Sequence, residues 1–138
     1  MLPQRVWSRH ANPKSGWTRL AAYPLLVYAV YARSNRLLAA VVAFLAINPF
    51  LFPAPETEPD DWMYRAVRAE EWWSDQGRPF VGVGYPQVLS LFGLLAFSCN
   101  LYAARKRRPV ATALPTVATM ALKLWFVDEL VRRHEAAG

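Results

Sequence analysis

Hydrophobic residues are concentrated in four stretches of this chain that contain no charged side chain. The stretches are residues 20–32, 37–55, 79–104 and 109–122. A bilayer core about 30 Å thick requires about 20 apolar residues per helix, and fewer where a flanking Lys or Arg reaches back to the interface. Arg19 and Arg33 flank the first stretch, and the fourth continues through Lys123 to Val127. The pattern predicts membrane spans at about residues 17–33, 37–53, 84–104 and 109–127.

Two of the predicted spans are apolar on all sides, which is typical of helices exposed to lipid. The segments LLAAVVAFLA, from Leu37, and LSLFGLLAF, from Leu89, contain no polar face, whereas a helix at the surface of a soluble bundle keeps one. The predicted fold class is therefore all-α, with residues 1–138 forming a single integral membrane domain built as a four-span helix bundle. A compact soluble helical protein is the alternative.

Short basic turns join the predicted spans in pairs. Residues 33–36 separate the first two spans and residues 105–108 the last two, so each pair forms an antiparallel hairpin. The long connection between the hairpins has tryptophan and alanine at helical spacing, at Trp62, Ala66, Ala69 and Trp73. It predicts an amphipathic helix over about residues 59–76 at the membrane interface, with a cap folded over the bundle as the alternative.

The first apolar stretch and the orientation have alternatives. A cleaved signal peptide is disfavoured because a long basic segment precedes the stretch and a second apolar stretch follows four residues later. A three-span arrangement, in which the first stretch is re-entrant, stays open. The two basic turns hold six Lys or Arg in eight residues, whereas nine are spread over the opposite side. Their density favours the turns in the cytoplasm, whereas the raw count of basic residues favours the reverse orientation.

Composition and charge favour a lipid partner over a nucleic acid. Hydrophobic residues make up 54% and charged residues 19% of the chain, and the formal net charge is +6; ordinary soluble domains have about 45–50% and about 25%. The basic residues lie at the ends of apolar stretches, which is typical of contacts with anionic headgroups of the bilayer. We predict such contacts at Arg33, Arg36, Arg105, Lys106, Arg107 and Arg108. A homo-oligomer is also compatible with the sequence.

A polar stripe follows one side of the fourth predicted span. Its members recur at helical spacing, at Thr112, Thr116, Thr119 and Lys123. Hydrogen bonding between helices explains such a stripe, and Lys123 can reach the far interface. The alternative is a polar cavity that also includes Asn48 of the second span and Asn100 of the third.

Few other residues have the setting of a catalytic or metal-binding group. Asn12 before Pro13 fits a helix N-cap, and the single cysteine, Cys99, fits a packing residue. The sequence contains no nucleophile, phosphate-loop or metal motif, so we predict no catalytic residue, no metal and no cofactor. The weak candidates for chemistry are His10, Asn12, Glu70, Glu71 and Asp128.

Four motifs resemble those of one family of small prokaryotic membrane proteins, classed as a domain of unknown function. They are RHANPKSGW at residues 9–17, NPFLFP at 48–53, EEWW at 70–73 and KLWFVD at 123–128. The resemblance covers nearly the whole chain in the same order. It implies a multi-span membrane protein and supplies no activity or site residue.

The sequence therefore predicts a multi-pass protein of the cell membrane, with three candidate functions. The first is a non-enzymatic structural or accessory role. The second is a small transporter or permeation element that uses the polar stripe; small multidrug exporters rely on a carboxylate in the first span, which residues 20–32 lack. The third is a membrane-embedded enzyme acting on lipid, which requires His10 within hydrogen-bonding distance of a carboxylate such as Glu70.

Overall fold

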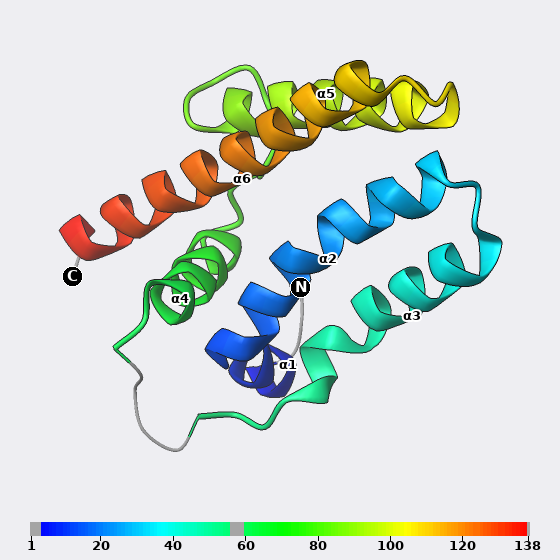
Figure 1. Cartoon of the computed structure of the whole chain (residues 1–138). Helices are drawn as coiled ribbons and strands as arrows, with labels where there is room; N and C mark the ends of the chain where they lie inside the picture. The colour runs from blue at the N-terminus through cyan, green and yellow to red at the C-terminus, as the bar shows by residue number, and fades with distance from the viewer. Residues whose placement is uncertain (1–3, 56–59, 138) are drawn as a thin grey trace.

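The computed structural model describes residues 4–55 and 60–137 as an assembly of α-helices (Figure 1). Within these ranges there are six helices and no strand, which confirms the predicted all-α class. The helices are α1 (Gln4–His10), α2 (Pro13–Tyr31), α3 (Asn35–Leu51), α4 (Trp62–Asp75), α5 (Gln87–Arg105) and α6 (Pro109–Ala137).

Capping side chains set where α2 and α4 begin. The side-chain oxygen of Asn12 accepts a hydrogen bond from the Lys14 amide at 3.0 Å, so α2 begins before residue 17, where the first span was predicted. The carboxylate of Asp61 accepts from the Met63 amide at 2.8 Å and caps α4 in the same way. The predicted start of this helix at residue 59 lies outside the described residues.

The two hairpins, α2–α3 and α5–α6, turn at the same end of the molecule. Figure 1 shows both turns on one side, with α1, α4 and the C-terminal end of α6 on the other. The Arg33 guanidinium donates to the Arg105 carbonyl oxygen at 3.3 Å, and the Arg107 guanidinium lies 5.5 Å from the centre of the Tyr31 ring. The two turns therefore form one joint surface, called here the basic tips (residues 33–36 and 105–108).

At each basic tip, an arginine with left-handed backbone follows the end of the first helix of the hairpin. The φ angles are 54° at Arg33 and 57° at Arg107. The amide after each arginine donates to the carbonyl five residues earlier, at 3.0 Å and 3.1 Å, which is the closing bond of a Schellman motif. Glycine is the usual residue at this position, and a side chain there costs roughly 1–2 kcal/mol. Arginine is thus present at both tips despite a conformational cost.

The apolar side of α4 packs on the last third of α6. The largest cluster of buried residues combines α4 and α6 with one residue of α5: Met63, Ala66, Ala69, Trp73, Phe126, Val127, Leu130, Val131 and Leu89. On α2, a Cβ at Gly16 would clash with the Met63 side chain, so glycine permits the close approach of α2 to α4. The helix α4 therefore covers one end of the bundle, as in the cap alternative.

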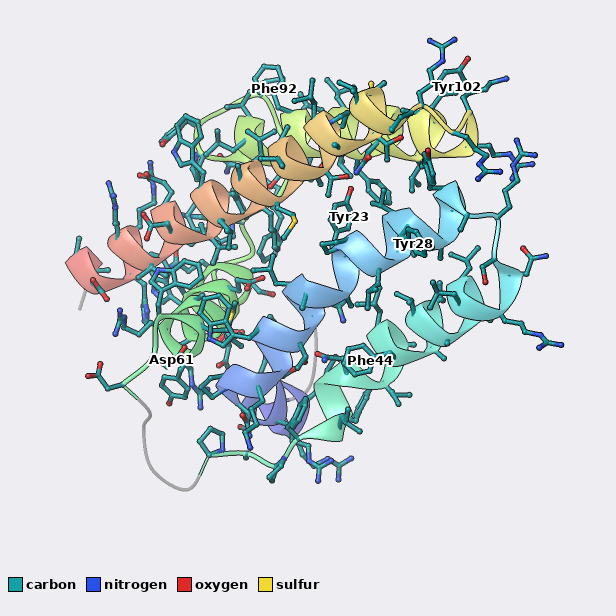
Figure 2. The ribbon with its side chains drawn as sticks, viewed as in Figure 1. Tyr23, Tyr28, Phe44, Asp61, Phe92 and Tyr102 are labelled. Carbon is teal, nitrogen blue, oxygen red and sulfur yellow. The ribbon has the colours of Figure 1, made fainter. Side chains whose placement is uncertain are left out.

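Much of the outer surface of the helices is apolar. Two helices, α5 and α6, are long and apolar enough to cross a membrane. Only 22% of the most apolar 18-residue segment of α5 and 17% of that of α6 is buried. The apolar helix α3 is shorter, at 17 residues. Figure 2 shows Phe92 on the outer side of α5, pointing away from α2, and Phe92 is 53% exposed. These helices thus face outward with their hydrophobic side chains.

Two leucines on α6, one buried and one exposed, test the packing of α4 on α6. We expect Leu130→Ala to lower the free energy of unfolding by about 2–5 kcal/mol, because Leu130 is fully buried against α4. The matched change Leu114→Ala should alter it by less than about 0.5 kcal/mol, because Leu114 is 67% exposed. Thermal unfolding in mild detergent, followed by tryptophan fluorescence, measures both. Equal losses would contradict the packing of α4 on α6.

Candidate functional site

A cavity of about 450 Å³ lies between α2, α4, α5 and α6, with His10 of α1 in its wall. Most of its lining is apolar and includes Leu20, Tyr23, Leu94, Phe97, Met120 and Leu124. The polar lining consists of His10, Arg19, Glu70, Ser90, Thr119 and Lys123. A concave, largely apolar site with a few convergent polar groups is typical of small-molecule binding.

A buried chain of hydrogen bonds supports the histidine of this cavity. The Nδ1 atom of His10 lies 2.9 Å from the Ser15 hydroxyl, and that hydroxyl donates to the Asn48 side-chain oxygen at 2.6 Å. The Asn48 amide nitrogen donates in turn to the Thr18 hydroxyl at 3.1 Å. Both Ser15 and Asn48 are fully buried. This series of hydrogen bonds connects the end of α1 to α2, and α2 to α3.

These hydrogen bonds determine which ring nitrogen of His10 carries the hydrogen. The Thr18 hydroxyl donates its hydrogen to the Lys14 carbonyl, so it must accept from the Asn48 amide nitrogen, and the Asn48 oxygen faces Ser15. Since Ser15 donates its only hydrogen to that oxygen, it accepts from His10 Nδ1–H. The neutral ring of His10 therefore carries its lone pair on Nε2.

The charged groups around His10 come from three different helices. Burial is the largest influence and lowers the pKa of His10 below its ordinary value of 6.5; Glu70 opposes the shift, and Arg19 and Lys123 add to it. The ammonium of Lys123 lies 3.7 Å from the Glu70 carboxylate, and Arg19 donates to the Leu45 carbonyl at 2.8 Å. At neutral pH, His10 is thus an uncharged imidazole beside two cations and one carboxylate.

The polar stripe of α6 has two parts with different neighbours. Toward the basic tips, Thr116 donates to the side-chain oxygen of Asn100 at 3.1 Å, and the Asn100 amide donates to the Tyr23 hydroxyl at 2.7 Å. Thr112 donates to the backbone of its own helix. Toward α4, Thr119 and Lys123 line the cavity. In Figure 2, Tyr23 extends from α2 toward the α5–α6 hairpin.

The hydroxyl oxygen of Thr119 is buried and has no hydrogen-bond partner among the described residues. The Thr112 hydroxyl donates to the Arg108 carbonyl oxygen just before α6, and the Thr116 hydroxyl bonds to Asn100. Thr119 lies one helical turn before Lys123 in the same cavity wall. A buried hydroxyl without a partner costs about 1–3 kcal/mol, so Thr119 is a polar group that a bound molecule could satisfy.

The predicted polar cavity is therefore distributed over three places. Asn48 lies in the hydrogen-bond chain behind His10, Asn100 lies in the network with Tyr23, and the cavity itself holds Thr119 and Lys123. The contributions of Ser15 and Tyr23 were not predicted. Ser15 lies five residues after His10, across the break between α1 and α2, and the packing of these two helices brings the side chains together.

The weak candidates occupy structural positions, apart from His10 and Glu70. Asn12 caps α2. Glu71 is buried and accepts from the Arg68 guanidinium at 2.7 Å. Asp128 accepts from the indole of Trp62 at 3.2 Å and pairs with Arg132 at 3.1 Å.

His10 and Glu70 share the cavity, but the described residues show no hydrogen bond between them. His10 contacts the hydroxyl of Ser15, and Glu70 pairs with Lys123. Within residues 4–55 and 60–137, no group of three or more His, Cys, Asp or Glu side chains could hold a metal ion. The six cations of the predicted headgroup contacts all lie on the basic tips, and Lys106 and Arg107 stack there on Tyr102 and Tyr31.

The helical fold and the cavity define a small all-α protein with an amphipathic cavity between its helices. The chain belongs to a family of unknown function, DUF6653, whose model matches residues 2–136. This confirms the resemblance seen in the sequence motifs. No curated protein and no solved structure matches the chain.

Two serines test the buried chain of hydrogen bonds. We expect Ser15→Ala to lower the free energy of unfolding by about 1–3 kcal/mol, because it leaves the buried Asn48 oxygen and His10 Nδ1–H without their partner. Ser98→Ala is the matched control, because the Ser98 hydroxyl is exposed and donates only to its own helix. Chemical unfolding in detergent measures the difference. Equal stability of the two variants would contradict the assigned network.

Proposed function

We propose that this protein is a four-span integral membrane protein of the cell membrane with a non-enzymatic, structural or accessory role. The observation that carries the proposal is the outward-facing apolar surface of its long helices. At a rise of about 1.5 Å per residue, α2 and α5 are each about 28 Å long and α3 about 26 Å, with 19, 19 and 17 residues. These lengths match the hydrocarbon core of a bilayer, about 30 Å thick.

The length of α6 supports the same placement. Its 29 residues extend over about 43 Å, which exceeds the thickness of the hydrocarbon core. The charged residues from Asp128 to Glu135 lie in its last third, where α4 covers its apolar side. The uncharged first part of α6 would cross the membrane, and the last part would lie with α4 at the interface.

Charge is distributed unequally between the two ends of the bundle. The six Lys and Arg of the basic tips equal the formal net charge of +6, so the other ten basic residues balance the ten acidic residues of the chain. A concentrated positive charge beside apolar spans favours the cytoplasmic side and its anionic lipids. We therefore place the basic tips in the cytoplasm and α4 at the opposite interface.

The hydrogen-bonding partners favour this role over transport or catalysis. A path along the polar stripe of α6 would need free polar groups toward the basic tips, whereas Thr116 and Asn100 bond to each other there. A lipid enzyme of the kind expected would pair His10 with a carboxylate, whereas Ser15 is its partner. Both groups of contacts hold helices together, as in a non-enzymatic bundle.

Cysteine labelling tests the four-span topology. In a Cys99→Ala background, Gln76→Cys should react with a membrane-impermeant maleimide in intact cells, and Asn35→Cys only in inverted vesicles. Val42→Cys should react in neither, because this exposed residue of α3 would face lipid. Labelling of residues 35 and 76 from the same side, or ready labelling of residue 42, would contradict four spans.

Lipid retention tests the contact of the basic tips with anionic headgroups. We expect Arg36→Gln combined with Lys106→Gln to reduce the phosphatidylglycerol that copurifies with the protein, since each tip cation contributes about 1 kcal/mol near an anionic surface. The matched control is Arg5→Gln with Lys14→Gln, two exposed cations at the other end. Phosphate analysis of protein purified at low and high salt measures retention. Equal retention in both double variants would contradict the assignment.

A further inference from the structure

The cavity between α2, α4, α5 and α6 contains three polar groups with unused hydrogen-bonding capacity. Nε2 of His10 has a lone pair and no partner among the described residues, because the Ser15 contact uses Nδ1. The Thr119 hydroxyl is buried without a partner among the described residues. The side chain of Lys123 is 57% exposed, and its carboxylate partner lies at 3.7 Å, which is longer than a strong charged hydrogen bond. A ligand with a polar head could bond to these three groups.

The charged lining of the cavity lies near α4, and apolar lining extends from there toward the basic tips. Glu70 belongs to α4, and its contact with Lys123 places that lysine and the charged part of the cavity near α4. Tyr23 and Phe97, whose rings are 6.0 Å apart, lie farther toward the basic tips. Along α5 the lining extends from Leu89 to Phe97, about 12 Å of helix. The site is thus an apolar slot with charged groups at the end near α4.

We propose that this cavity binds one single-chain amphiphile with a carboxylic acid head, such as a long-chain fatty acid. The carboxyl group would lie among Lys123, Arg19 and His10, and the chain would extend between Tyr23, Phe97 and Met120 toward the basic tips. The proposal does not depend on the number of membrane spans, because the cavity is a property of the packed helices.

The charge and size of the cavity select this ligand class. Two cations and one carboxylate line it beside a neutral imidazole, so a single negative charge is complementary to it. A volume of about 450 Å³ is within the range of small-molecule sites. The apolar lining extends about 12 Å along α5, so the cavity suits one acyl chain.

Because His10 lies beside the proposed carboxyl group, binding of the ligand is coupled to the uptake of a proton. In solution at neutral pH the carboxylate is ionised and His10 is neutral, so neither supplies a hydrogen for a bond between them. Binding therefore takes up one proton from water, which is held between a carboxyl oxygen and Nε2. Glu70 of α4, Arg19 of α2 and Lys123 of α6 are the charged groups that face this histidine.

Equilibrium dialysis of radiolabelled palmitate against the protein in nanodiscs of neutral lipid tests the proposal, with empty nanodiscs subtracted. We expect saturable binding of one palmitate per chain and weaker binding of hexadecanol. The affinity for palmitate should rise about tenfold for each unit that the pH falls below neutrality, since one proton is taken up. Equal binding of palmitate and hexadecanol would overturn the carboxylic acid head.

Three variants locate the bound ligand. Lys123→Met should weaken palmitate binding by about 10- to 100-fold, whereas Lys106→Met, at the basic tips, should leave it unchanged. His10→Gln should abolish the pH dependence, because an amide supplies its own hydrogen to the carboxylate. Gly93→Leu should remove binding by filling the slot, and its Cβ meets only Leu122 at an ordinary 3.9 Å.

Unfolding temperatures measured on the same samples show which variants are folded. Palmitate binding that survives both Lys123→Met and Gly93→Leu in folded protein would overturn the proposal. Loss of binding in Lys106→Met as well would also overturn it, because the charge effect would then not be local to the cavity. Cysteine labelling reports the membrane topology separately, so failure of one proposal is distinguishable from failure of the other.

Discussion

The packing of α4 on the last third of α6 is the interaction on which the rest of the structure depends. The helix α4 lies in the connection between the hairpins and is the element that contacts α1, α2 and α6 together. Its Trp73 is 1% exposed, and its alanines bring the backbone close to Phe126 and Leu130. Because α4 occupies this end of the bundle, α2 and α6 are held apart there. The cavity is the space that this separation leaves.

Polar pairs between helices close the bundle at the other end. Asn100 of α5 uses its oxygen for Thr116 and its amide for Tyr23, so one buried side chain joins three helices. Asn48 of α3 joins α3 to α2 in the same way, through Ser15 and Thr18. In an apolar surrounding such amides are stabilising only when both ends are bonded. Each asparagine therefore fixes the register of its helices, and neither is available to a ligand.

The helices α2 to α6 could be predicted from the sequence because their signals are local, whereas α1 was not predicted. The charge-free stretches, the cap at Asn12 and the breaks at the basic turns depend on neighbours within a few residues. The cavity could not be predicted, since His10, Glu70 and Lys123 are far apart in the chain and meet only through the packing of α4. Spacing placed Thr116 and Thr119 on one side of α6. It did not reveal that Asn100 faces the first threonine and the cavity faces the second.

The arginines of the basic tips show how charge and conformation are balanced in this fold. At Arg33 and Arg107 a left-handed backbone would be less costly with glycine, and in the described part of the chain the tip cations form no ion pair. Arg33, Lys106 and Arg107 make a hydrogen bond or a ring contact within the fold, but these contacts do not neutralise their positive charge. At the cavity end Lys123 has an acidic partner in Glu70, whereas Arg19 donates to the Leu45 carbonyl oxygen. The surplus charge of the molecule thus equals the charge of the basic tips, and the lining of the cavity holds two cations beside one carboxylate.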